Sequence, residues 1–309
     1  MSVCVVGHSN PDTDSVAAAI SFANYLNATG TKAVATMQIA AADLNPESKL
    51  VLKKFGVAAP ETMTDAAGKD VALVDFSDIG QAPANIDKAN VVAVVDHHKI
   101  GDLTTNSPIY FYAKPVGCSC TVLYEMYKNN NIAISKEIAG VMVCAILSDT
   151  VNFKSPTCTP DDKAAVKALL PLAGVSDQDA LFMDMLKAKS SIEGVAIKDL
   201  IFRDYKDFDM KGNKVGIGQI ELATLEQVAG IREELYKAIS DIKKDGRHSV
   251  LFMLTDVVKE GTDLLVVSDD PALIEKAFKG KISGQSMWVD GMMSRKKQTV
   301  PPLQAAFGC

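Results

Sequence analysis

The chain has 309 residues, of which 48% are hydrophobic and 23% charged, and its formal net charge is −6. This composition is ordinary for a globular protein, and the length suffices for two domains. The negative balance disfavours broad binding to nucleic acids or anionic membranes, which needs a large positive field. No apolar stretch reaches the roughly 18 residues that span a bilayer, and residues 1–10 do not resemble a signal peptide. The cysteines are scattered and lack CxxC spacing. Together, these features predict a cytoplasmic protein with reduced thiols.

The first half of the chain alternates between strand-like and helix-like segments. Short apolar runs predict strands at residues 2–7, 32–40, 70–76 and 90–98. Helices are expected at residues 14–30, 120–131, 135–150 and 159–174, the last with Thr159 as its N-cap and Pro160 at its first position. Because the strands are almost continuously apolar, the pattern predicts an α/β domain whose mostly parallel sheet is covered on both faces and flanked by helices.

The sequence becomes polar around residues 186–200 and then resumes its alternation. We place a linker at 189–194, between a first domain at 1–188 and a second at 195–309. Strands are expected at 214–222, 249–258 and 263–268, and helices at 224–244 and 270–280, with Gly280 capping the latter. These elements predict a smaller α/β domain with a mixed sheet.

Residues that commonly bind metals stand where elements of the first domain end or begin. They are His8, Asp12 and Asp14 after the first strand, Asp75 after "VALV", Asp96, His97 and His98 after "VVAVV", and Asp149 after an apolar helix. Because parallel strands end at one edge of a sheet, most of these groups should converge there. Carboxylates packed so closely repel one another unless a cation lies between them. Mixed carboxylate and imidazole ligands suit Mn²⁺, Co²⁺, Fe²⁺ or Zn²⁺, and two such ions can turn a bridging water into hydroxide that attacks phosphorus.

Each of these residues also has an ordinary structural interpretation. A lone aspartate at a strand end is most often a turn former, and Asp12 could simply cap the helix that begins near residue 14. A lone buried histidine is more often a satisfied core residue than a ligand. These interpretations would have to hold independently at every position, whereas one metal site explains all of them together. His248, in "DGRHS", keeps the structural interpretation.

The densest basic cluster lies near the C-terminus, in "GMMSRKKQTV", with Arg295, Lys296 and Lys297 in succession. A short basic run is usually a solvated loop. Lys206, just past the linker, is a further candidate cation. Arginine can donate two hydrogen bonds to a phosphate and lysine supplies a point charge, so the two domains could close over a phosphate in the cleft between them.

Several segments together resemble the family II inorganic pyrophosphatases of the DHH phosphoesterase superfamily. They are "GHSNPDTDS", "ALVD", "AVVDHHKI", "KPVGCSCT", "ILSDTVNFKSPT" and "SRKKQ", in the family's order. The DHH tripeptide marks only the superfamily, and "SRKKQ" is the specific part. The resemblance implies that a metal-bridged hydroxide hydrolyses pyrophosphate to two phosphates. It also implies a homodimer joined through the N-terminal domain.

The resemblance further implies a role for each site residue. His8 and Asp12 would bind the first metal, Asp14, His97 and Asp149 the second, and Asp75 both. His98, Lys206, Arg295 and Lys296 would bind the substrate, and Asp96 would orient a histidine. The ions would be Mn²⁺ or Co²⁺, with Mg²⁺ entering with the substrate. Phe76, where many relatives have a polar residue, and Cys118, where some have serine, depart from the family pattern.

Two other functions are compatible with the residues. A DHH-type exonuclease or oligonucleotide phosphodiesterase is disfavoured by the acidic balance and by the absence of aromatic stacking platforms near the basic run. A non-catalytic, metal-dependent phosphate sensor is disfavoured by the complete ligand set.

Overall fold

The computed structural model describes residues 2–309, which divide into two compact units at Lys189 and Ser190. The first unit holds six strands: β1 (Val3–Val6), β2 (Ala33–Met37), β3 (Glu61–Thr62), β4 (Asp70–Val74), β5 (Asn90–Asp96) and β6 (Tyr110–Ala113). They form one parallel sheet in the order β3-β2-β1-β4-β5-β6. The predicted parallel α/β architecture of this part is therefore confirmed.

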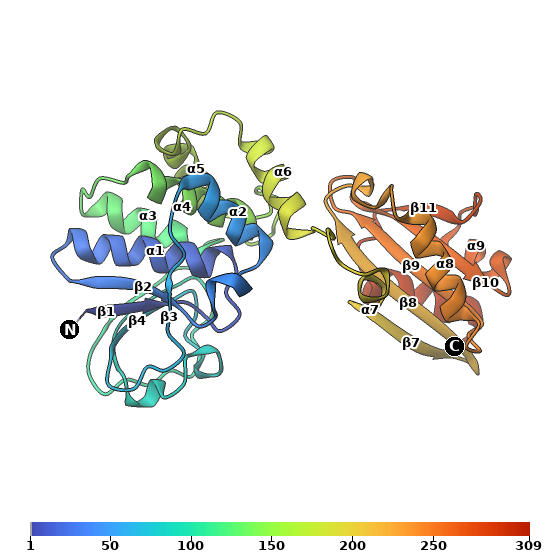
Figure 1. Ribbon diagram of the computed structural model, residues 1–309, viewed down its shortest axis with the longest axis horizontal. Coiled ribbons are helices and arrows are strands. Elements are labelled where there is room, and N and C mark those ends of the chain that lie inside the picture. Colours follow the sequence, from blue (N-terminus) through green and yellow to red (C-terminus); the bar gives the residue numbers. More distant parts are fainter. Residues whose placement is uncertain (1) are drawn as a thin grey trace. The chain divides into compact units, whose positions relative to one another are not determined.

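Helices cover one face of this sheet (Figure 1). They are α1 (Thr13–Ala28), α2 (Pro46–Phe55), α3 (Ser119–Asn129), α4 (Lys136–Asp149), α5 (Pro160–Ala173) and α6 (Gln178–Lys189). Loops and the 3₁₀ turns Ile79–Gln81 and Ile86–Lys88 cover the other face, where Leu73 and Phe76 are buried. Both faces are covered, which explains why the central strands are apolar at almost every position.

The strand order fixes where a ligand site can lie. β1 and β4 are neighbours, but the chain leaves them in opposite directions across the sheet, first to β2 and later to β5. Open α/β sheets bind ligands at the carboxyl ends of the strands where the order reverses in this way. His8 follows β1 and Asp75 follows β4, so these two residues flank the reversal point.

The second unit contains a five-stranded mixed sheet in the order β11-β10-β9-β8-β7, with β8 and β9 parallel and the other pairs antiparallel. Its strands are β7 (Tyr205–Met210), β8 (Asn213–Leu222), β9 (Ser249–Asp256), β10 (Gly261–Ser268) and β11 (Ser286–Asp290). Helices α7 (Ile197–Phe202) and α8 (Arg232–Lys243) cover one face, and α9 (Pro271–Phe278) and α10 (Val300–Phe307) the other. The predicted mixed sheet is confirmed.

Two details of the second unit differ from the sequence prediction. The helix expected at 224–244 is split into a 3₁₀ turn at Leu225–Val228 and α8, with Gly230 in the break, where glycine's low helix propensity favours an interruption. Helix α9 ends at Phe278, and its C-cap is Lys279, which takes the left-handed conformation itself (φ 53°), so Gly280 is not the cap.

Candidate active site

The carboxyl edge of the first sheet brings the predicted acidic residues and histidines together in two overlapping groups. His8, Asp12 and Asp75 form one group, and Asp14, His97 and Asp149 form the other; Asp75 and His97, together with His98, form a further cluster that links the two. Within each group the candidate ligand atoms all lie within 4.8 Å of one another. These residues come from turns and helix ends that are far apart in the sequence, and the sheet is what makes them neighbours.

Asp75 lies between the two groups. Its Oδ2 is 3.4 Å from Nε2 of His8, and its Oδ1 is 3.3 Å from Nε2 of His97. The residue is buried and has a φ of 67°, a left-handed conformation that costs a non-glycine residue energy. Ser119 Oγ donates a hydrogen bond of 2.9 Å to Oδ1. Strain at this position directs one carboxylate toward both histidines.

His97 is held so that only one of its nitrogens is free for a ligand. Its Nδ1 lies 3.0 Å from the carbonyl oxygen of Val116. A carbonyl can only accept, so Nδ1 carries the proton and the lone pair of the neutral ring is on Nε2, beside Asp75. A backbone carbonyl behind a histidine is the usual support of a metal-binding imidazole.

His98 stands in a different environment although it is the next residue. Its side chain is 53% exposed, and its Nδ1 lies 3.0 Å from Oδ1 of Asp96. The same oxygen accepts the backbone N–H groups of His97 and His98. Asp96 itself is buried, so one carboxylate fixes the turn that holds both histidines and places the Nδ1 proton of His98.

Asp14 and Asp12 combine site and helix roles at the start of α1. Asp14 is fully buried and accepts the backbone N–H groups of Ser119 (2.6 Å) and Cys120 (3.1 Å). Asp12 is the N-cap of α1, because its Oδ1 accepts Ser15 N–H, and it also lies 3.7 Å from Nε2 of His8. The capping interpretation of Asp12 and its place in the ligand group therefore hold together.

The pKa values in this cluster are shifted by the crowding. Burial alone would lower the pKa of His8, but hydrogen bonds to Asp12 and Asp75 outweigh it and raise the value to about 10. Burial also opposes the upward shift of His97, whose pKa the Asp75 hydrogen bond and the Asp14 charge raise to about 9. Burial and the charge of Asp75 raise the pKa of Asp14 to about 7. Burial and Asp14 raise that of Asp149 well above its ordinary value.

Asp75 shifts in the opposite direction. Burial would raise its pKa, but hydrogen bonds from His8 and His97 hold the value well below its usual range. Protons on the two histidines therefore supply the positive charge that the buried carboxylates need. The ion pairs of Asp75 among residues 2–309 are with histidine.

This donor set fits divalent metal ions. Buried carboxylates that raise one another's pKa need a cation, and a metal ion can replace the protons on the histidines. Two atoms bound to the same ion at ~2.1 Å lie roughly 3.0–3.5 Å apart, close to the separations of Asp75 from His8 and His97. Carboxylate and imidazole together suit Mn²⁺ and similar ions.

The predicted cations of the second unit gather around one edge of its sheet. Arg295 is only 9% exposed, and its guanidinium binds Oδ1 of Asp204 (2.6 Å), the backbone oxygen of Asp204 (2.5 Å) and the oxygen of Ile217 (3.4 Å). Lys206 pairs with Ile217 across β7 and β8, so it lies near Arg295. Lys206 and Lys296 are both exposed.

The basic run is more ordered than the solvated loop that such runs usually form. Residues Arg295–Thr299 make a single helical turn. Gln298 accepts the N–H groups of Met293 and Ser294 and donates to the oxygen of Gly291. Gln219 accepts the N–H of Arg295. These amides hold the turn in place.

Three residues of the site, Ser119, Glu47 and Asp162, were not predicted from the sequence. Ser119 binds both Asp75 and Asp14. Glu47 is buried and accepts hydrogen bonds from Thr13 and Ser148, the neighbours of Asp14 and Asp149. Asp162 anchors the turn before α3. The segment "KPVGCSCT" carried a signal for Ser119, whereas nothing in the spacing of Glu47 indicated its contacts.

The chain is similar to known proteins over nearly its whole length. Residues 2–146 match the DHH family N-terminal domain, and residues 183–306 match the DHHA2 domain. The manganese-dependent inorganic pyrophosphatase of Methanothrix thermoacetophila is 48% identical over 99% of this chain and 98% of its own. That of Methanocaldococcus jannaschii is 42% identical over 98% of both chains. The chain belongs to the manganese-dependent, family II inorganic pyrophosphatases. The resemblance inferred from the motifs is confirmed.

Two solved structures have a similar fold. A Methanococcus jannaschii crystal structure ascribed to the same family has a TM-score of 0.62 at 42% identity, with 99% of both chains covered. An exopolyphosphatase-related protein from Bacteroides fragilis, with a TM-score of 0.53, 13% identity and coverage of 99% of this chain and 92% of its own, shares the fold. None of the helices described here, within residues 2–309, is long and apolar enough to cross a membrane.

Proposed function

We propose that the protein is an inorganic pyrophosphatase that hydrolyses pyrophosphate to two orthophosphates and depends on Mn²⁺, or Co²⁺, at two positions. The observation that carries the proposal is the pair of ligand groups that meet at Asp75. Family membership across nearly the whole chain supports the same activity.

In this proposal His8 and Asp12 hold the first ion, Asp14, His97 and Asp149 hold the second, and Asp75 contributes to both. Bound ions would lower the pKa of a coordinated water and neutralise charge that develops on the phosphates. The protein itself holds the donor side chains in position before an ion binds. Val116 sets the tautomer of His97, and Ser119 orients the Asp75 carboxylate.

His98 is proposed to contact the substrate. The Asp96 hydrogen bond raises the pKa of His98, which favours the protonated ring. With Nδ1–H bound to Asp96, the exposed Nε2–H is free to donate to a phosphate oxygen. Lys206, Arg295 and Lys296 are proposed to bind the phosphates and offset their charge, with Mg²⁺ entering with the substrate.

The domain organisation and assembly are part of the same proposal. We assign residues 1–188 to a metal-binding domain, 189–194 to a linker and 195–309 to a substrate-binding domain, and place the protein in the cytoplasm. A homodimer formed through the first domain is supported by β6, an edge strand whose residues Tyr110, Phe111 and Tyr112 are exposed.

Phosphate release from pyrophosphate tests the activity, with Mn²⁺, with Mg²⁺ and with EDTA. We expect release with Mn²⁺ and loss of it in EDTA. Asp75→Ala should abolish turnover and weaken both metal positions, because one carboxylate faces both histidines. Asp43→Ala, at an exposed aspartate of the same unit, is the matched control. Near-full turnover of Asp75→Ala in Mn²⁺, or faster cleavage of a short oligonucleotide than of pyrophosphate, would contradict the proposal.

A further inference from the structure

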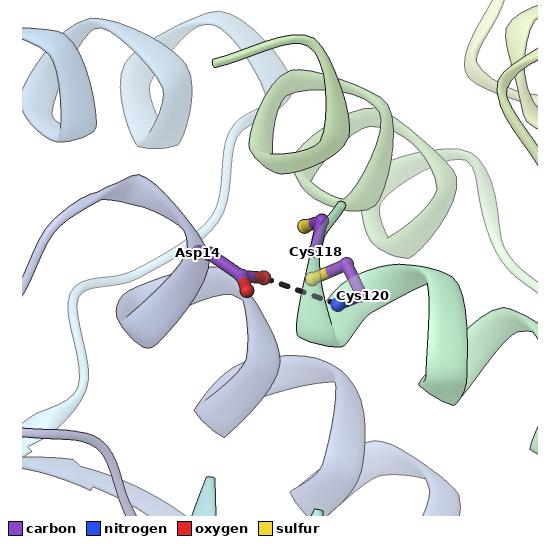
Figure 2. Close-up of side chains that lie close together, drawn as sticks. All are labelled: Asp14, Cys118 and Cys120. Carbon is purple, nitrogen blue, oxygen red and sulfur yellow. Dashed lines mark hydrogen bonds between the residues drawn. The ribbon is translucent and has the colours of Figure 1, made fainter. Parts of the chain in front are cut away.

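Two cysteines at the start of α3 lie next to the Asp14 carboxylate. Cys118 is the N-cap residue of this helix, and Cys120 is its second residue. Both side chains are completely buried, as is Asp14. One carboxylate oxygen and the two sulfur atoms lie within 4.8 Å of one another. Figure 2 shows both thiol groups on the side of the turn that faces the Asp14 carboxylate.

The turn that carries the two thiols is rigid. Asp162 accepts the N–H of Gly117 (2.9 Å) on one side of the cysteines and the hydroxyl of Thr121 (2.6 Å) on the other. Asp14 in turn accepts the N–H of Cys120, and this bond is drawn in Figure 2. The three donor groups are therefore fixed relative to one another by hydrogen bonds that do not involve the sulfur atoms.

Sulfur donors change which ions such a site prefers. Carboxylate and imidazole suit Mn²⁺, whereas thiolates select softer ions such as Zn²⁺. Cd²⁺ shares this preference. A bound soft ion displaces the thiol protons to solvent, so the high pKa of buried thiols does not prevent coordination.

We propose that Asp14, Cys118 and Cys120 form a binding site for thiophilic divalent ions, represented by Zn²⁺ and Cd²⁺. An ion held there engages Asp14 and so removes this carboxylate from the group that it forms with His97 and Asp149. Binding at the thiols stands on the cluster alone, whereas the inhibition that follows from it depends on the function proposed above.

The binding is tested with Cd²⁺ alone, added to metal-free protein, and followed by the ultraviolet sulfur-to-cadmium charge-transfer band. The parent protein carries Cys309→Ser, which removes the exposed thiol. We expect a band in the parent, a weaker band in Cys118→Ser and in Cys120→Ser, and none in the double variant. Cys144→Ser, at an equally buried thiol on α4, should keep the full band. Absence of the band in the parent, or its persistence in the double variant, would overturn the proposal.

Cadmium NMR of the parent protein gives a second measurement that needs no cysteine variant, in case the double variant fails to fold. A chemical shift in the range of sulfur ligands supports the site, and a shift typical of oxygen and nitrogen ligands alone overturns it.

Inhibition is read separately, as phosphate release by Mn²⁺-loaded protein with and without Cd²⁺, each variant compared with itself. The double variant should need at least about 10-fold more Cd²⁺ for the same loss of activity, since even outer supports of a metal site change affinity by that much. Equal sensitivity of the parent and the double variant refutes inhibition through the thiols. A charge-transfer band in a protein without pyrophosphatase activity would refute the proposed function and leave the site standing.

Discussion

Two adjacent histidines show how individual contacts assign different chemistry to identical side chains. His97 donates a hydrogen bond from Nδ1–H to a backbone carbonyl and presents Nε2 to Asp75, inside the cluster. His98 donates a hydrogen bond from Nδ1–H to Asp96, and its side chain is half exposed. Because each ring has one nitrogen fixed by a buried acceptor, the function of the other nitrogen depends on what lies in front of it.

Substituting the two histidines separately should give opposite results. His97→Ala removes a metal donor and should weaken Mn²⁺ binding by about 10-fold or more. His98→Ala should leave Mn²⁺ affinity nearly unchanged and lower kcat by about 100-fold, the usual contribution of a positioned proton donor. Calorimetric Mn²⁺ titration and phosphate release measure the two effects.

His248→Ala is the matched control for both variants. Its ring packs against Phe307 in the second unit, outside both ligand groups. Equal loss of Mn²⁺ affinity in the His97 and His98 variants would show that the proposed division of roles is wrong.

At the level of helices, one buried carboxylate joins the elements that carry the metal groups. Glu47, in the first turn of α2, accepts the hydroxyl of Thr13 at the start of α1 (2.9 Å) and that of Ser148 at the end of α4 (2.9 and 3.0 Å). Lys189, the last residue of α6, lies 4.0 Å from the same carboxylate. The start of α1, the start of α2 and the end of α4 are therefore held together next to Asp14 and Asp149.

Glu47→Gln should loosen this arrangement without changing its size. The amide has one accepting oxygen where the carboxylate has two, and it carries no charge. The buried hydrogen bonds from Thr13 and Ser148 are therefore fewer and weaker, at a cost of about 1–3 kcal/mol in the free energy of unfolding. We expect Mn²⁺ affinity to fall by about 10-fold, since Glu47 supports the helices that carry the ligands. Calorimetry and thermal unfolding measure both effects, with the exposed Glu61→Gln as control. Unchanged Mn²⁺ affinity would refute a positioning role.

The elements near the site could be predicted because their signals are local. Thr159, Pro160 and Asp162 start α5 with a complete capping box, and the apolar runs of β1, β4 and β5 indicate buried strands. The break before α8 and the left-handed Lys279 were missed because hydrogen bonds and packing outside the segment decide them. Contacts such as Glu47 with Ser148 depend on how helices pack, which no periodicity records.

At the scale of the whole molecule, the first sheet has one edge that another chain can extend. The residues of β6 are all exposed, and Tyr110 and Tyr112 stack on one another at a centroid distance of 6.1 Å. An edge strand leaves backbone donors and acceptors unpaired on its outer side. Apolar aromatic surface beside such an edge favours pairing with a second copy of the chain.

A charge on this edge should therefore disrupt the proposed dimer. Phe111→Lys introduces a charge whose burial between two copies would be costly, so we expect monomers in sedimentation velocity at concentrations where the unmodified protein is dimeric. Leu172→Lys, at an exposed position of α5 in the same unit, should not change the sedimentation coefficient. If the unmodified protein sediments as a monomer, or Phe111→Lys as a dimer, the proposed interface is wrong.

The convergence of the metal groups could be predicted from the sequence because the parallel sheet is itself predictable. His8, Asp75 and His97 each follow a strand of one sheet, so topology alone brings them to one edge. The burial of Arg295 against Asp204 could not be predicted, because it depends on how a C-terminal turn meets β7 and β8. A basic run gives no signal for which of its members turns inward.

The strand order also determines when a metal can enter during folding. The first ligand group joins His8 and Asp12 to Asp75, so it needs β1 and β4 to have paired. The second joins Asp14 to His97 and Asp149, so it also needs β5 and α4 in place. Pairings between such distant segments form slowly, because the chain loses much entropy before they yield any stabilisation. An ion in solution therefore finds neither complete group on a chain whose parallel strands have not yet paired, and the second group completes only when α4 has packed on the sheet.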